Sequence, residues 1–408
     1  MSKLENPSFV ITGDVHINGG RWGGVNPETG RSRAAEHTYG VWQSICKRAV
    51  EASATLIVCG DLFLDGHPRP EDVEMLADGI RLVSEAGLES VILRGNHDPR
   101  HLPLGQRHPL ARYADLPGVV VMDTPMLHTL RSGVTVVGLP WPRVSDYFER
   151  GEDVGESVDD ADTAVAERAT ERLRSLTDRA VDIGGPVIVI AHCTVDTATL
   201  GSGKRGSEVM LGKLFHEPVL PLSAFVDERV SHVALGHIHL RQQLAERVFY
   251  CGAPDIFDFG EEAQEKAFSL VTVDLDDPRA AANVEAIPTA ARAFRTIDVG
   301  VGTTLDEINV EPGELVRIRL EAQATLPEQA IRRAVLEQEA EVVTVAIIPP
   351  AEREERRRSL KEEVGVLEGL SSWLADVSGE DADSHAAIIR EAEALMAEAG
   401  SIEAGGEG

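Results

Sequence analysis

The chain contains, at residues 93–99, the sequence Leu93-Arg94-Gly95-Asn96-His97-Asp98-Pro99. An apolar run ends at Leu93, and after Arg94 and a glycine come an amide, an imidazole and a carboxylate. A buried strand that delivers polar groups to a pocket has this pattern. The stretch therefore predicts one edge of an active site.

Four other stretches repeat the pattern, in which a short apolar run is followed by Asp or His. They are Asp14-Val15-His16, Gly60-Asp61, Ala191-His192 and Gly236-His237-Ile238-His239. Each piece alone is weak evidence, because a single buried histidine is more often a hydrogen-bonded core residue than a ligand. Five such pieces in one chain indicate a site.

Strand-like and helical segments alternate along the first 240 residues. Apolar runs predict strands at 8–14, 55–59, 90–93, 187–191 and 230–235, and helical spacing predicts helices at 34–51 and 71–86. This alternation is typical of an α/β layered domain, whose ligands gather where the strands end. We therefore expect the polar strand ends to lie close together.

The residues at these strand ends offer carboxylate, amide and imidazole groups but no thiolate. The candidate metal ligands are Asp14, His16, Asp61, Asn96, His192, His237 and His239. This set suits manganese, iron or zinc at two adjacent positions better than a single calcium or a sulfur-bound zinc. Two such ions, about 3.5–4 Å apart, stabilise the entering and leaving oxygens of a displacement at phosphorus. Asp61 is the expected bridging carboxylate.

His97 is the candidate catalytic acid. It directly follows the ligand Asn96, so its ring is expected beside the metals, where it can protonate a leaving oxygen. Asp98 is expected to assist by fixing the tautomer of His97.

The net charge of the chain is -29, with 43% hydrophobic residues. This charge argues against a protein that coats nucleic acid through bulk positive potential, because phosphate binding normally draws on clustered Lys and Arg. Any contact with DNA must be local. The composition is that of a soluble globular protein with a large core.

Short sequence signals bear on compartment and membrane association. Residues 1–10 lack the features of a signal peptide, and no window approaches 18 apolar residues, so we expect a cytoplasmic protein without a membrane span. The four cysteines form no Cys-x-x-Cys pair and are expected to be reduced and mostly buried.

The character of the sequence changes after residue 276. We expect a domain with the site at 1–280, a small α+β domain at 281–349, a helical partner-binding region at 350–399 and a disordered tail at 400–408. In the α+β domain, Arg317 and Arg319 face one side of a predicted strand. That face is either solvated or in contact with DNA.

The ordered motifs resemble those of the calcineurin-like metallophosphoesterase superfamily. Within it, Gly60-Asp61-Leu62-Phe63, Tyr250-Cys251-Gly252-Ala253-Pro254 and Asp258-Phe259-Gly260-Glu261-Glu262 resemble the SbcD-type DNA repair nucleases. The resemblance implies a two-sheet α/β sandwich flanked by helices, with a small α+β cap. It also implies C-terminal helices that bind an SbcC-like coiled-coil ATPase, and it leaves a homodimer open.

The same resemblance implies roles for individual residues. One metal would be held by Asp14, His16, Asp61 and His239, and the other by Asp61, Asn96, His192 and His237. His97 would be the catalytic acid, assisted by Asp98, and Mn²⁺ the usual ion, with Fe²⁺ and Zn²⁺ as alternatives. Leu64 departs from the family, which often has Asp or His there.

The leading hypothesis is a Mn²⁺-dependent DNA phosphodiesterase of the SbcD type, an exonuclease or an endonuclease, that acts with an SbcC-like ATPase on DNA ends. Two alternatives stay open. The first is a phosphoesterase that acts on a nucleotide or a phosphoprotein, and the second is a non-catalytic structural subunit.

Overall fold

The computed structural model describes residues 6–19, 22–98, 109–149, 151–152, 154–155, 157–199, 217–348 and 390. The expected disordered tail, and the expected partner-binding region apart from Arg390, lie outside the described residues. The expectations for these two regions therefore stay predictions.

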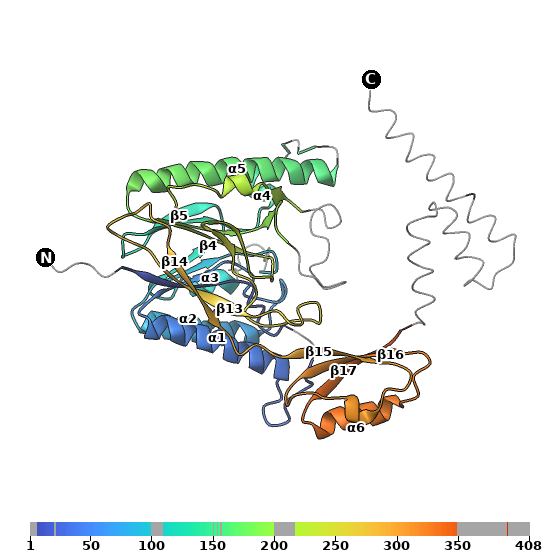
Figure 1. Ribbon diagram of the computed structural model, residues 1–408. Helices are drawn as coiled ribbons and strands as arrows, with labels where there is room; N and C mark the ends of the chain where they lie inside the picture. Colours follow the sequence, from blue (N-terminus) through green and yellow to red (C-terminus); the bar gives the residue numbers. More distant parts are fainter. Residues whose placement is uncertain are drawn as a thin grey trace. The chain divides into compact units, whose positions relative to one another are not determined.

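The first sheet has six strands in the order β14-β13-β1-β2-β3-β4. Figure 1 labels β4, β13 and β14 of this sheet. The six strands span Ser8–Thr12 (β1), Thr55–Val58 (β2), Ser90–Leu93 (β3), Val119–Met122 (β4), Ala267–Thr272 (β13) and Asn283–Pro288 (β14). Strands β1 to β4 run parallel, and β13 pairs antiparallel with β1. The carboxyl ends of β1, β2 and β3 consequently meet at one edge.

The second sheet has the order β11-β12-β10-β7-β6-β5. Its strands span Met126–Thr129 (β5), Thr135–Leu139 (β6), Val187–His192 (β7), His232–Gly236 (β10), Gln242–Ala245 (β11) and Val248–Tyr250 (β12). Strands β6, β7, β10 and β12 are parallel. In this register Gly236 lies beside His192, which brings the ends of β7 and β10 together. A two-stranded sheet pairs β8 (Thr194–Val195) with β9 (Val219–Leu220).

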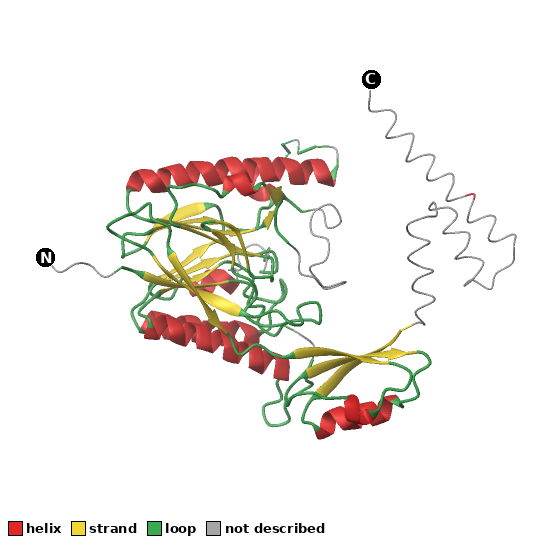
Figure 2. Ribbon diagram, in the orientation of Figure 1, coloured by secondary structure: helices red, strands yellow, loops and turns green. Residues whose placement is uncertain are grey.

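Helices cover the outer faces of both sheets (Figure 2). α1 (Arg33–Glu51) and α2 (Pro70–Glu85) pack on the first sheet, and α5 (Val158–Ile183) packs on the second. α5 begins with a capping box, in which Ser157 accepts from the backbone N–H of Asp160 and the Asp160 carboxylate accepts in return. The shorter helices are α3 (Pro109–Tyr113) and α4 (Val144–Tyr147).

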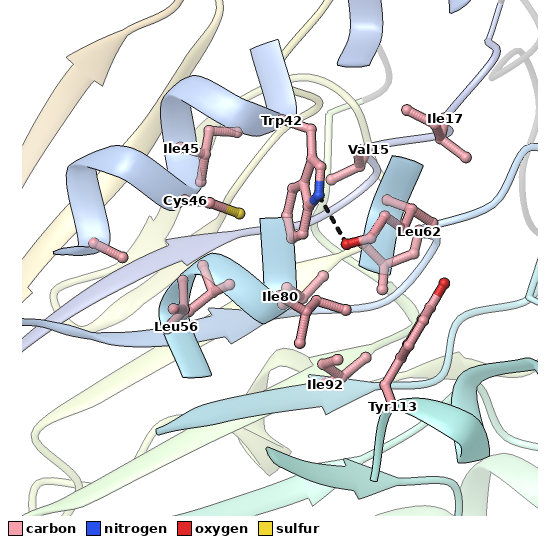
Figure 3. Packing of buried hydrophobic residues seen from close by; sticks show 14 of the residues in the cluster. Val15, Ile17, Trp42, Ile45, Cys46, Leu56, Leu62, Ile80, Ile92 and Tyr113 are labelled. Carbon is pink, nitrogen blue, oxygen red and sulfur yellow. Dashed lines mark hydrogen bonds between the residues drawn. The ribbon is translucent and has the colours of Figure 1, made fainter. Parts of the chain in front are cut away.

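The core lies in three layers because both faces of the central strands are buried. In β1, Phe9 and Ile11 belong to the cluster between the two sheets, whereas Val10 belongs to the cluster beneath α1 and α2. Trp42 of α1 is buried in the latter cluster and donates from Nε1 to the carbonyl of Leu76 (Figure 3). Continuous apolar runs, rather than alternating ones, are the sequence pattern of such strands. The predicted two-sheet sandwich is thus confirmed.

A third sheet contains β15 (Phe294–Val299), β16 (Leu315–Glu321) and β17 (Glu341–Ile348), in that order, and α6 spans Glu328–Glu337. Contacts divide the chain into two units. The first comprises Met1–Ile297, Ile308–Arg317 and Arg332–Thr344, and the second comprises Asp298–Glu307, Ile318–Ile331 and Val345–Gly408. Strand β14 pairs with β13, so the first sheet extends past residue 280. The division into domains stays a proposal.

The two arginines of β16 have acceptors within the protein. Arg317 donates to Oγ1 of Thr296 and its guanidinium lies 4.7 Å from the ring centre of Phe259. Arg319 forms a two-pronged ion pair with Asp298. These contacts favour the solvated-face interpretation over a surface built for DNA.

No described helix is both long and apolar enough to cross a membrane. All four cysteines are buried and free, as expected.

Candidate metal centre

The structure brings all seven predicted ligand residues together at the carboxyl ends of β1, β2, β3, β7 and β10. The donor atoms form two groups. The Asp14 group contains Asp14, His16 and His239, and the Asp61 group contains Asp61, His192 and His237; within each group the candidate ligand atoms lie within 4.8 Å of one another. Oδ1 of Asn96 adds to the Asp61 group, at 2.8 Å from Nε2 of His192 and 3.1 Å from Nδ1 of His237.

Asp61 lies between the two groups. Its Oδ2 atom is 3.3 Å from Nε2 of His192 in its own group and 3.7 Å from Nε2 of His16 in the Asp14 group. Its Oδ1 atom accepts from the backbone N–H of His97 at 2.8 Å, which leaves Oδ2 facing both groups. This is the position that a carboxylate bridging two cations requires.

The backbone is held in the left-handed region at four of these residues. The φ angles are 52° at Asp14, 42° at His16, 52° at Asp61 and 95° at His237. Such conformations cost on the order of 1–3 kcal/mol each and persist only where the surroundings enforce them. Here the backbone N–H groups of Asp14 and His16, which follow β1, donate to the backbone carbonyls of Gly60 and Asp61, which follow β2.

Apolar residues that alternate with the ligands anchor these turns in the core. Val15, Ile17 and Leu62 are fully or almost fully buried in the cluster beneath α1 and α2 (Figure 3). Because these neighbours point into the core, Asp14, His16 and Asp61 are directed toward the space between the strand ends.

Two glycines permit the close approach of the strand ends. A Cβ atom at Gly95 would overlap the carboxylate and backbone nitrogen of Asp61, and one at Gly236 would overlap the carbonyl of Cys59. The glycine that precedes each polar residue in the sequence motifs is therefore a steric requirement at these two positions.

Backbone carbonyls orient two of the four histidines. Nδ1 of His16 lies 3.1 Å from the carbonyl of Phe63, and Nδ1 of His192 lies 2.8 Å from the carbonyl of Cys59. A carbonyl only accepts, so Nδ1 carries a proton in both rings and Nε2 is the nitrogen that faces the site.

Carboxylates lie beside the other two histidines. Nδ1 of His239 is 2.7 Å from Oε1 of Glu261, which leaves Nε2 of His239 facing Nε2 of His16 at 3.1 Å. In His237 the ring is reversed, because Nδ1 faces Asn96 while Nε2 lies 3.4 Å from Oε2 of Glu217. Each histidine thus directs one nitrogen into the site and the other toward an acceptor, as metal-binding histidines do.

The electrostatics of the centre fit bound cations. Burial lowers the pKa of His16 to about 3, so its ring is neutral at pH 7. Burial also opposes the charge of His192, but the neighbouring Asp61 carboxylate outweighs it and raises the pKa of His192 to about 9. Oδ2 of Asp14 is buried and has no hydrogen-bond partner among the described residues. A buried, unpartnered carboxylate oxygen among imidazole nitrogens is a site that a divalent cation would satisfy.

His97 lies where it was predicted, but Asp98 does not orient it. The His97 ring is exposed, with its centre 5.0 Å from that of His16, and its Nδ1 donates to the carbonyl of Leu64 at 2.8 Å. The expectation that Asp98 fixes this tautomer is wrong.

Asp98 is instead buried and accepts from four backbone N–H groups that surround it. These belong to Asp61, Leu62, Phe63 and Gly95, at 2.7–3.2 Å. Its carboxylate ties the loop after β2 to the loop after β3 and so holds Asp61 in place. Burial, with the Asp61 charge adding to it, raises the pKa of Asp98 to about 6.

Sequence reasoning missed three residues beside the centre. Trp141 is partly exposed, with its ring centre 4.8 Å from that of His237, and Glu217 and Glu261 approach ring nitrogens. Glu217 and Glu261 do not end an apolar run in the way the ligands do, and Trp141 follows the apolar run 134–139 but is itself not a metal-ligand residue type. Only Glu261 had a signal, because it lies in the motif Asp258-Phe259-Gly260-Glu261-Glu262.

Comparisons with known proteins identify the family of this chain. The model of the calcineurin-like phosphoesterase family matches residues 7–241. The SbcD component of the nuclease SbcCD of Escherichia coli strain K12 is 25% identical over 256 residues, which are 59% of this chain and 60% of the relative, and that of strain O157:H7 gives the same values. The chain thus spans about 60% of the length of these curated relatives. A solved dimetal phosphatase from Danio rerio is 14% identical, over 68% of this chain and 98% of that one, with a TM-score of 0.42.

Proposed function

Because this chain belongs to the calcineurin-like phosphoesterase family, we propose that it is a two-metal DNA nuclease of the SbcD type. The observation that carries the proposal is the pair of donor groups that share Asp61, with the exposed His97 beside them. The proposed ion is Mn²⁺, which takes mixed oxygen and imidazole donors.

The proposed ligands divide as the donor groups do. Asp14, His16 and His239 would hold one ion, His192, His237 and Asn96 the other, and Asp61 both. Two divalent ions bound there would supply positive charge to the attacking and leaving oxygens and make water a stronger nucleophile.

In the proposed reaction a water oxygen forms a bond to phosphorus while the bond to the leaving sugar oxygen breaks. The leaving oxygen needs a proton, and we assign its transfer to Nε2 of His97. Nδ1 of this ring is engaged with the carbonyl of Leu64, so the orientation of the ring does not depend on the substrate.

The open side of the centre supports a nucleic-acid substrate. His97 is exposed, and Asn96, His239 and Trp141 are partly exposed, whereas Asp14, Asp61 and His192 are buried. A partly exposed tryptophan beside a phosphodiester site is a surface on which a base can stack.

The test is cleavage of linear duplex DNA with defined ends in the presence of Mn²⁺, with and without an SbcC-type ATPase. Asp61→Asn should abolish cleavage. His128→Ala is the matched histidine control, because His128 lies in β5 away from the centre, and it should cleave as the unchanged protein does.

The two alternatives give different results in the same assay. Hydrolysis of small phosphate esters with no cleavage of DNA in either condition would favour a nucleotide or phosphoprotein substrate. Two bound ions with no turnover of any ester would favour a non-catalytic structural subunit.

Further assignments rest on the curated relatives, which are matched over only part of their length. We propose that the chain acts with an SbcC-like ATPase in DNA end processing and repair, through the region 350–399. A cytoplasmic location is part of the same proposal.

A further inference from the structure

Glu261 is buried beside the metal centre and makes three contacts with its one carboxylate. Oε1 accepts from Nδ1 of His239 at 2.7 Å, while Oε2 lies 2.8 Å from Nζ of Lys266 and accepts from the backbone N–H of Phe257 at 3.2 Å. The residue is only 1% exposed. A carboxylate withdrawn from water in this way needs charged or hydrogen-bonded partners, and all three partners are present.

Lys266 forms a second link between Glu261 and His239, because it contacts both residues. Its ammonium group, on a residue that is 5% exposed, lies 3.4 Å from the backbone carbonyl of His239 as well as 2.8 Å from Glu261. It is further held by Oε1 of Gln264 at 3.0 Å. The ring and the backbone of His239 are thus both tied to one buried ion pair.

Phe257 completes the support. Its backbone binds Glu261, and its ring packs at right angles on His16, with centres 5.4 Å apart, and at a tilt on His239, with centres 5.6 Å apart. Glu261 therefore contacts His239 directly, and it also binds the backbone of the residue whose ring packs on both imidazoles of the Asp14 group.

The other histidines lack an equivalent. His16 and His192 are oriented by neutral backbone carbonyls. Glu217 lies 3.4 Å from Nε2 of His237, and that nitrogen has no hydrogen-bond partner in the described structure. Among the four rings, His239 has the shortest contact with a carboxylate from outside the donor groups, and that carboxylate is paired with a lysine.

We propose that Glu261, held by Lys266, is a positioning residue that fixes the tautomer and ring orientation of His239 and so determines the affinity of the Asp14 group for its ion. The inference rests on the proposed two-metal function. It predicts that the two ions differ in their dependence on Glu261. Loss of a partner that orients a ligand costs about 10- to 100-fold in metal affinity.

The experiment is a titration of the metal-free chain with Mn²⁺, followed by the electron paramagnetic resonance signal of the free ion. The unchanged protein should bind two ions. In Glu261→Ala, one ion should bind about 10- to 100-fold more weakly and the other with unchanged affinity. Glu261→Gln should restore part of the loss, because its amide oxygen still accepts from Nδ1 of His239.

Two controls separate positioning from folding. Glu261→Ala combined with Lys266→Met removes both charges, so no unpaired ammonium stays buried, and should show the same loss of one ion. Glu262→Gln is the matched neighbour, since Glu262 accepts from Thr296 instead, and should bind both ions normally. Thermal unfolding of each metal-free variant measures its stability.

Two results would overturn the inference and leave the proposed function standing. One is normal affinity for both ions in Glu261→Ala. The other is an equal loss of both ions in Glu261→Ala and in the double variant, together with a lower unfolding temperature, which would make the role structural. If the unchanged protein binds no Mn²⁺, the proposed function itself fails.

Discussion

The ring of His97 is oriented by the backbone carbonyl of Leu64, which accepts from Nδ1 at 2.8 Å. The contact uses no side-chain atom of Leu64, whose own side chain is partly exposed. A chain with leucine at this position can therefore hold the His97 ring beside the metal centre.

His97→Ala should reduce phosphodiester hydrolysis by about 10²- to 10⁴-fold, the contribution of a general acid. The affinity for Mn²⁺ should change little, because the His97 ring is not in either donor group. Steady-state kinetics and a Mn²⁺ titration of the same sample check both parts. Loss of one bound ion would instead make His97 a ligand.

Asp98→Asn should destabilise the metal-free protein by about 1–3 kcal/mol, because one oxygen that accepts from buried N–H groups becomes an amide that cannot accept. Denaturant unfolding in the presence of a chelator measures this. His97→Ala serves as the comparison and should unfold like the unchanged protein. Equal stability of the two variants would argue against a structural role for Asp98.

Asp61→Asn and Asp14→Asn should differ in the number of ions affected. Oδ2 of Asp61 faces both donor groups, so Asp61→Asn should weaken both ions, whereas Asp14→Asn should chiefly weaken one. The loss of metal affinity should be larger than the loss of about 10- to 100-fold that follows from removing a residue that only hydrogen-bonds to a metal ligand. Calorimetric titration with Mn²⁺ resolves the two ions, and identical profiles for both variants would count against a bridging Asp61.

Gly95→Ala should impair metal binding while the fold persists. The added methyl group would overlap the Asp61 carboxylate, which must then leave its position between the groups. Gly40→Ala is the matched control, because Gly40 lies within α1 and, apart from its own helix backbone and chain neighbours, no described atom lies within 4 Å of an added Cβ. That change should stabilise the protein by about 0.5–1 kcal/mol. Normal Mn²⁺ binding by Gly95→Ala would contradict the steric argument.

His232 should make the metal-free protein less stable in acid. Burial lowers the pKa of this histidine to about 4, with Arg241 adding to the effect, from 6.5 in the unfolded chain. Between these values the unfolded chain binds more protons, so this contribution is present above pH 6.5 and is lost as the pH falls toward 4. The full contribution is on the order of 3 kcal/mol.

In His232→Leu the unfolding free energy should therefore fall less steeply as the pH decreases below about 6.5. The slope of the unfolding free energy against pH should be smaller by the equivalent of up to ~1 bound proton. Denaturant unfolding at several pH values, with a chelator present, measures it. Parallel curves for the variant and the unchanged protein would exclude His232 as a source of the acid sensitivity.

The strands that carry the centre were predictable because both of their faces are buried. β3 spans Ser90–Leu93 as expected, and β7 and β10 differ from their predicted ranges by one or two residues. β14 was not predicted, since it is the edge strand of its sheet and most of its residues are exposed or half-buried. An edge strand without an apolar face leaves little pattern in the sequence.

The sequence by itself determined which side chains meet, because a polar residue at the carboxyl end of a buried parallel strand can only emerge at the edge shared by its neighbours. The tertiary structure alone decided what each polar group contacts. His97 binds the backbone carbonyl of Leu64, and Asp98 binds backbone N–H groups of the loop after β2. Backbone carbonyls and N–H groups are the same at every residue, so no pattern of side chains specifies which of them will lie within reach of a given ring or carboxylate.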